Sequence, residues 1–199
     1  MIIQFDIDCK NYEKLIMNEY QIYNYTCPKC LAKSDWVRHA IYERNVVLVE
    51  IIAFIEVKMK ILRLKCKSCN STHAILPSDI IPYCIYSLPF IFAIISEYYL
   101  EEDSVLCIAK EYKISFQVIY NYLKLFESFI NECISTLRIL EIIKGISIAA
   151  TKEIFKLIVD NFENNSFVKK YAQINKWPFL MKKFRNIYHI PIYIGFANL

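Results

Sequence analysis

Four cysteines, arranged as two Cys-x-x-Cys pairs, are the residues whose types and spacing best suit chemistry. The pairs are Cys27-Pro28-Lys29-Cys30 and Cys66-Lys67-Ser68-Cys69, and 35 residues separate them. Each pair can form a tight turn that presents two thiolates on one side, and four thiolates complete the tetrahedral shell of Zn²⁺. The connection is longer than the usual ~15–20 residues of such sites. The sequence nevertheless predicts one structural Zn²⁺ bound by Cys27, Cys30, Cys66 and Cys69.

Other uses of these cysteines fit the sequence less well. Disulfides need an oxidising compartment, and the first residues show neither the basic start nor the long apolar run of a signal peptide. A redox Cys-x-x-Cys usually stands alone at a helix start near a βαβ unit, a setting that neither pair has. Four unliganded cysteines are the remaining structural alternative.

The remaining histidines and cysteines are not assigned to the metal. A lone histidine beside a complete set of four cysteines is more often a surface or phosphate-facing residue, which is the expectation for His39 and His73. The other four cysteines lie in apolar settings typical of reduced core residues: Cys9, Cys84, Cys107 and Cys133.

The residues around the two pairs predict the β-structure that holds them. Runs rich in β-branched and aromatic residues cover 36–42, 46–57 and 60–64, so we expect about three antiparallel strands, the last leading into the second pair. Residues 2–7 alternate as an edge strand would, and residues 11–20 can form a short helix. We expect this first segment to cover a small zinc-ribbon domain over residues 1–83.

Helical patterns follow the second pair. Residues 76–83 contain two prolines and predict an extended linker. Ser87 can cap a helix over 88–101, and helical spacing returns at 125–143 and 151–162. The predicted fold class is α+β: a small antiparallel β zinc ribbon, a helix-turn-helix region over 84–130, and a helical C-terminal region with a basic tail over 131–199.

The segment after Ser104 has the pattern of a helix-turn-helix. Two helices that cross steeply need a small residue at their contact, which Ala109 provides, and a cap for the second helix, which Ser115 provides. Apolar residues occupy the inner positions: Ile108, Tyr112, Ile114, Ile119 and Tyr122. The outward face of the second helix then carries Ser115, Phe116, Gln117, Tyr120, Asn121 and Lys124. Such side chains can bind base edges in the major groove; the alternative is an ordinary helical hairpin with a solvated polar face.

These motifs resemble the zinc-ribbon and helix-turn-helix region of insertion-sequence transposases, and a domain family of unknown function found in transposase-like bacterial proteins. The resemblance covers about residues 1–126, and residues 72–83 are its most specific part. It favours glycine in the turn where this chain has Lys113. Because a left-handed backbone is strained for lysine, we expect the turn to differ. We also expect five basic residues to lie on or near one face of the ribbon and to contact phosphates: Arg38, His39, Arg44, Lys65 and Lys67.

The net charge of +4 is unevenly distributed. Residues 1–163 carry a net −2, and residues 164–199 carry +6 without any acidic residue. In this tail, Lys and Arg alternate with aromatic residues, which suits phosphate contacts with stacked rings as well as a packed helix whose lysines extend into solvent. The most apolar window, 85–95, is too short to span a bilayer. We therefore expect a cytoplasmic protein without membrane contact.

No enzyme is predicted. A transposase needs a carboxylate cluster that holds two metal ions, and the acidic residues after the helix-turn-helix lie on predicted helices of a region too short for such a domain. The resemblance therefore implies the DNA-recognition half alone: an accessory or regulatory protein that binds double-stranded DNA and works with a transposase or recombinase encoded nearby, as a monomer or an oligomer. The alternative is a zinc-stabilised protein–protein interaction module that does not bind DNA.

Overall fold

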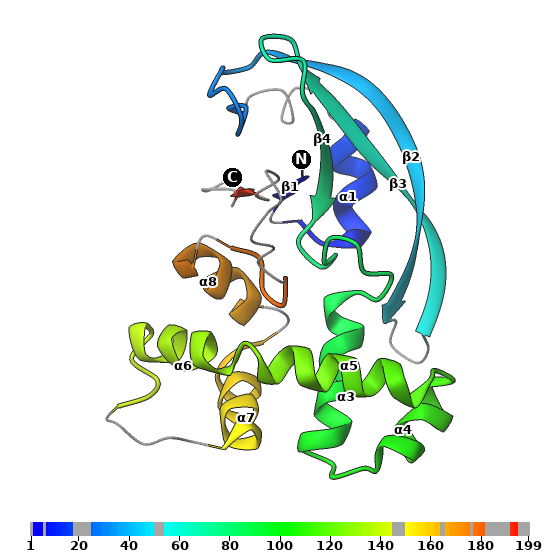
Figure 1. Ribbon diagram of the computed structural model, residues 1–199, viewed down its shortest axis with the longest axis vertical. Coiled ribbons are helices and arrows are strands. Elements are labelled where there is room, and N and C mark those ends of the chain that lie inside the picture. The colour runs from blue at the N-terminus through cyan, green and yellow to red at the C-terminus, as the bar shows by residue number, and fades with distance from the viewer. Residues whose placement is uncertain are drawn as a thin grey trace.

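A computed structural model describes residues 2–5, 7–17, 25–49, 54–144, 150–163, 166–175, 177–181 and 192–194. One sheet contains β1 (Ile2–Phe5), β2 (Trp36–Val49), β3 (Phe54–Cys66), β4 (Thr72–Pro77) and β5 (Ile192–Ile194). The helices are α1 (Cys9–Met17), α3 (Leu88–Tyr99), α4 (Val105–Tyr112), α5 (Phe116–Glu127), α6 (Ile130–Ile139), α7 (Thr151–Asn161) and α8 (Ser166–Asn175). The antiparallel strands β2, β3 and β4 of this mixed sheet, followed by helices, confirm the α+β prediction (Figure 1).

The strand order is β2-β3-β4-β1-β5, and it corrects two expectations. The third antiparallel strand, β4, follows the second cysteine pair instead of preceding it, because the runs on either side of Lys58 form one continuous strand. In addition, β1 is an interior strand: it pairs in parallel with β4 on one side and with β5 on the other. The first segment of the chain is thus part of the sheet.

The β2–β3 hairpin is long and curved, and its buried face changes along its length (Figure 1). Near the cysteines, the even-numbered residues of β3, Leu62 and Leu64, are buried; nearer the hairpin end, the odd-numbered Ile61 and Met59 are buried. Successive residues of a strand point to opposite faces, so the strong right-handed twist of a two-stranded ribbon turns one face and then the other toward the core. This is why polar residues such as Lys58 and Arg44 do not end these strands.

Two hydrophobic clusters form the core. The first joins α1 to the sheet, with Tyr12 and Ile16 packed against Ile61 and Leu64. The second lies among α3–α8 and is rich in aromatic residues, including Phe126, Phe155 and Tyr171. The part of the chain described here contains no helix that is both long and apolar enough to cross a membrane.

The far end of the hairpin enters the helical cluster. Phe54 lies 4.9 Å from the ring of Phe90 on α3 and 4.4 Å from that of Tyr112 on α4, measured between centroids. The linker of the structure is the segment between β4 and α3, residues 78–87. The backbone of Val47 bonds with this linker, accepting from Ser87 N–H and donating to the Ile85 carbonyl. The hairpin therefore connects the cysteine end of the molecule to its helices.

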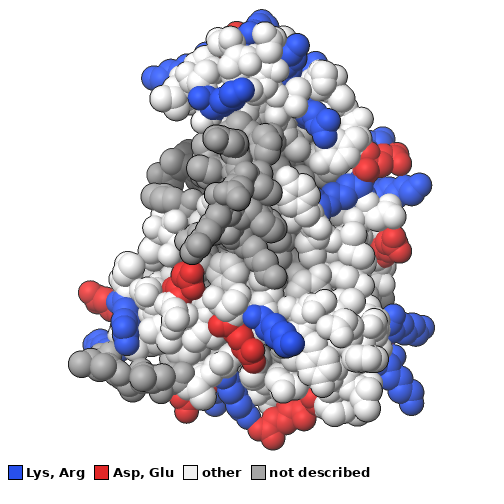
Figure 2. Space-filling model, viewed as in Figure 1, with Lys and Arg blue, Asp and Glu red and all other residues white. Residues whose placement is uncertain are grey.

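Charge is distributed unevenly along the hairpin axis. Residues 25–42 and 61–77, which form the cysteine end, contain six Lys and Arg and one acidic residue, Asp35. Residues 84–144, in the linker and helices, contain five Lys and Arg and eight acidic residues. Figure 2 shows the same contrast, with Lys and Arg dominating the upper end and both signs mixed in the lower half.

Tyr12 supplies a first test of this packing. Its hydroxyl is buried, donates to the Ile75 carbonyl at 2.6 Å and accepts from Leu62 N–H at 3.1 Å. Tyr12→Phe leaves both backbone groups unsatisfied, so we expect it to lower the free energy of unfolding by about 1–3 kcal/mol in chemical denaturation. The control is Tyr171→Phe, because the buried Tyr171 hydroxyl has no hydrogen-bond partner among the described residues. Equal effects of the two substitutions would contradict this role for Tyr12.

Candidate metal centre

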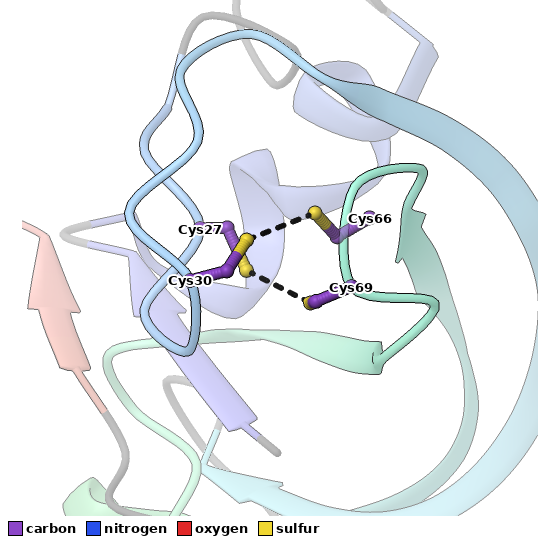
Figure 3. Close-up of side chains that lie close together, drawn as sticks. All are labelled: Cys27, Cys30, Cys66 and Cys69. Carbon is purple, nitrogen blue, oxygen red and sulfur yellow. Dashed lines mark hydrogen bonds between the residues drawn. The ribbon is translucent and has the colours of Figure 1, made fainter.

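The four cysteines predicted to bind metal lie together, and their sulfur atoms all fall within 4.8 Å of one another. Cys27 Sγ lies 3.7 Å from Cys69 Sγ, and Cys30 Sγ lies 3.6 Å from Cys66 Sγ. Figure 3 shows each pair projecting from its own turn toward the other pair, so that the two turns close around a common centre. Within the described residues, no other group of His, Cys, Asp and Glu side chains meets the same criterion for a metal cluster.

The two cysteine turns share one backbone pattern. In the first, Cys27 N–H donates to the Ala32 carbonyl; in the second, Cys66 N–H donates to the Ser71 carbonyl, in each case across five residues. The residue after each second cysteine has a positive φ, 62° at Leu31 and 57° at Asn70. This left-handed residue reverses the chain so that both thiols of a pair point the same way. Leu31 adopts this conformation without the freedom of glycine.

Contacts between the turns hold them in register. Lys67 N–H donates to the Asp35 carbonyl at 2.9 Å, and the Ser68 hydroxyl donates to the Asp35 carboxylate. Trp36 pairs directly with Cys66 across the hairpin, and its indole N–H donates to the Tyr25 carbonyl at 2.7 Å. The start of β2 and the end of β3 thus carry the two cysteine turns side by side.

The protonation of the thiols depends on their positions. Burial raises the pKa of Cys27 to about 12 against opposing hydrogen bonds from the backbone of Cys30 and Lys29, and burial also raises the pKa of Cys66. For Cys69, burial is outweighed by hydrogen bonds from the side chain and backbone of Ser71, which bring its pKa to about 6. A cation at the centre would favour the thiolate at every position, because opposite charge offsets the cost of burial.

The spacing of the sulfur atoms fits a tetrahedral metal ion. Four sulfurs at the usual Zn–S bond length of about 2.3 Å are separated by about 3.8 Å along each tetrahedral edge. The 3.6 and 3.7 Å separations are close to this value, whereas a disulfide requires about 2.05 Å. All eight cysteines are free thiols. The site therefore has the ligand types and the dimensions of a structural metal site.

His73 has a place that the sequence reasoning missed. It is fully buried, its Nε2 lies 3.7 Å from Cys27 Sγ, and its ring stacks edge-on against Trp36 at 5.0 Å. The expectation of a surface or phosphate-facing residue was wrong for His73, because β4 pairs its position with Leu64 on the buried face of β3. An Nε2–H here can donate to the Cys27 thiolate and support a metal ligand from behind.

The predicted phosphate-binding residues do not share one face. Val37 pairs with Lys65 and Arg38 pairs with Leu64, so Arg38 and Lys65 point to opposite faces of the hairpin. Arg38, His39 and Lys67 are exposed, and Lys65 is half-buried.

Arg44 is committed to the interior of the protein. Its guanidinium donates to the carbonyl of Ile81 at 3.1 Å and to that of Cys84. Its side chain is half-buried, and burial lowers the pKa of Arg44. Its position supports a structural role between the hairpin and the linker.

The pair α4–α5 has the predicted inner and outer residues. Of the predicted inner residues, Ile108, Tyr112 and Ile119 are buried, whereas Ile114 and Tyr122 are half-buried. Ser104 and Ser115 cap the helices by accepting from Cys107 and Gln117 N–H. Lys113 adopts the left-handed conformation, with φ 52° and ψ 39°, so the expectation of a different turn was wrong. The outward residues are all exposed: Ser115, Phe116, Gln117, Tyr120, Asn121 and Lys124.

The cysteines outside the metal centre and the residues of the basic tail differ in burial. Cys9 and Cys133 are buried as expected, whereas Cys84 is half-buried and Cys107 is exposed on α4. Within the tail, Phe167 and Tyr171 of α8 are buried and Lys169 and Lys170 are exposed, as in a packed helix. The other predicted basic residues of the tail lie outside the described residues: Lys176, Lys182, Lys183 and Arg185.

A family model described as a domain of unknown function (DUF6431) matches residues 27–110. The matched region begins at Cys27, includes both cysteine pairs, the linker and α3, and ends within α4. Comparison with curated proteins and with solved structures found no match.

The four-cysteine site can be tested by measuring how much metal the protein contains. We expect one Zn²⁺ per chain in protein purified without chelator, and loss of that metal with melting of the hairpin in Cys69→Ser, because metal-binding energy is folding energy at such sites. Metal analysis and circular dichroism measure the two effects. Cys107→Ser is the control, since Cys107 is exposed and remote from the centre. Metal-free protein with an intact sheet would contradict the site.

The position of His73 behind Cys27 leads us to expect that its loss weakens metal binding but leaves the metal site in place. His73→Ala should retain one metal per chain but weaken its binding about 10–100-fold in competition with a chelator, as for other groups that support metal ligands. His39→Ala is the matched control, because His39 is exposed on β2. If both variants bind the metal as tightly as the wild type, His73 only fills space.

Proposed function

We propose that this chain is a zinc-containing DNA-binding protein, similar to the recognition region of transposases, that binds duplex DNA through a helix-turn-helix formed by α4 and α5. Zn²⁺ is the metal of choice because four cysteine ligands at tetrahedral spacing are typical of structural zinc sites. The proposed role is accessory or regulatory. The observation that carries it is the exposed face of α5.

The rotation of α5 supports this role. Ile119, Leu123 and Phe126 point into the helical cluster, which leaves one continuous polar and aromatic face in solvent. In a helix-turn-helix, the second helix enters the major groove and its first turns contact base edges. Gln117 and Asn121 lie one turn apart on that face, and Gln117 Nε2 donates to Asn121 Oδ1 at 3.2 Å. This contact orients two amides of the kind that bind adenine.

The residues around α5 also suit the binding of duplex DNA. Asn121, Lys124 and Ser128 line an open pocket of about 540 Å³, together with Tyr86 of the linker. A pocket beside a recognition helix can accept a stretch of sugar–phosphate backbone, which Lys124 can neutralise and Ser128 and Tyr86 can hydrogen-bond. The metal centre would take no part in base contacts and would keep the hairpin folded.

One observation favours the interaction-module alternative. Leu106 on α4 and Phe116 and Tyr120 on α5 are 73, 53 and 44% exposed, and exposed apolar side chains can be buried by a protein partner. Aromatic residues at these positions are equally able to contact thymine methyl groups. Stoichiometric co-purification of a protein partner, without any affinity for duplex DNA, would favour the alternative.

Substitutions on α5 test the proposal. On a duplex selected from a random library, Gln117→Ala or Asn121→Ala should cost about 1–3 kcal/mol of binding free energy and much less on unselected DNA, whereas Lys124→Ala should weaken both alike. Fluorescence anisotropy at several salt concentrations measures these effects. Asn131→Ala and Lys156→Ala, at exposed positions of α6 and α7, are the matched controls. No loss of preference in either amide variant would reject α5 as the reading helix.

A further inference from the structure

We infer that the protein contacts one DNA duplex at two places about one helical turn apart, with α5 at one and the basic end of the hairpin at the other. The basic end is defined here as Lys29, Lys33, Arg63, Lys65 and Lys67. The inference rests on the proposed function and deepens it, because it assigns the phosphate-binding residues and the spacing of the two contacts.

The helices alone offer little attraction for DNA. Lys124 is the one basic residue on the outward face of α5, and residues 84–144 carry more acidic than basic side chains. Affinity for duplex DNA comes largely from neutralised phosphates, and each one contributes to the salt dependence. Lys124, with the exposed Lys110 and Lys113 of α4 and the turn, supplies few cations for a duplex at physiological salt, so we expect further cations elsewhere on the molecule.

The basic end supplies them. Lys29 and Lys67 lie inside the two cysteine turns and, like Lys33 and Arg63, are exposed. Arg63 and Lys65 are two residues apart on β3 and share one face, where the guanidinium of Arg63 lies 5.0 Å from the centre of the Tyr42 ring.

Negative charge at this end is limited. Asp35 is the one carboxylate in the segments that form it, and it accepts a hydrogen bond from Ser68. A bound metal with four thiolates would add a net charge of about −2 at the centre, which is fewer charges than the surrounding lysines and arginines carry.

The hairpin sets the distance between the two contacts. β3 has 13 residues, which at about 3.3 Å per residue gives a contour of roughly 40 Å, and its curvature shortens the direct path. One turn of B-DNA is about 34–36 Å. Cys66 at one end of β3 is a metal ligand candidate, and Phe54 at the other end packs against Tyr112, the last residue of α4. The two surfaces are therefore about one helical turn apart.

The hairpin is also fixed in direction. Arg44 links β2 to the carbonyls of Ile81 and Cys84, and Val47 is bonded on both sides to the linker before α3. In the shared view of Figures 1 and 2, α5 crosses the near side of the lower half, and basic side chains emerge on the near side of the upper end. One face of a straight duplex can reach both.

The test combines shortened DNA with a charge variant. A selected duplex is shortened from each end in steps of about half a helical turn, ~5 bp. The variant Lys29→Ala/Lys33→Ala/Lys67→Ala removes three exposed cations; the control Arg138→Ala/Lys144→Ala/Lys156→Ala makes the same change in net charge on and beside α6 and α7. Metal content and circular dichroism confirm that both variants are folded.

We expect the basic-end variant to bind the long duplex about 10–100-fold more weakly, with a salt slope smaller by about 3, while the control changes little. Removing about one turn of DNA on one side should weaken the wild type by a similar factor and leave the variant unaffected. If neither the basic-end substitutions nor the shortened duplex changes the affinity, while the α5 variants still bind weakly, the inference is overturned and the proposed function stands. Failure to bind any duplex at low salt rejects both.

Discussion

The long β2–β3 hairpin depends on how its two ends are held. An isolated two-stranded hairpin is marginally stable in water, and this one has strands of 14 and 13 residues. At one end, four sulfur atoms within 4.8 Å of one another bring the start of β2 and the end of β3 together. At the other end, the partly exposed Phe54 contacts aromatic rings of α3 and α4. Between them, α1 covers the face that the twist turns inward.

Because both ends are held, the hairpin couples regions that are far apart. Arg44 shows how: a cation that the sequence suggests for phosphate binding instead satisfies two carbonyls of the linker. The linker needs such donors, since an extended segment with prolines cannot pair all of its own backbone groups. The strands therefore connect the cysteine turns to the linker and to α3.

Local chemistry in the sequence was sufficient for much of the candidate site. The cysteine spacing predicted which residues meet, and Ser104 and Ser115 marked the starts of α4 and α5. Features that depend on strand pairing between distant segments could not be predicted from local sequence. The pairing of β4 with the inner face of β3 buries His73, and only the register reveals that Arg38 and Lys65 point to opposite faces. Lys113 was misread because strain of about 1–2 kcal/mol, although real, is affordable when two packed helices determine the turn.

The position of β1 has a consequence for the order of folding. This strand pairs in parallel with β5, about 190 residues later in the chain. During synthesis, the cysteine turns, the hairpin and α3–α5 emerge long before β5, so they can associate while one edge of β1 is still open. Contacts of such high sequence separation form late and slow the final step. Until then, β1 is an unpaired strand edge, which in a nascent chain can recruit a chaperone or a second copy of the protein.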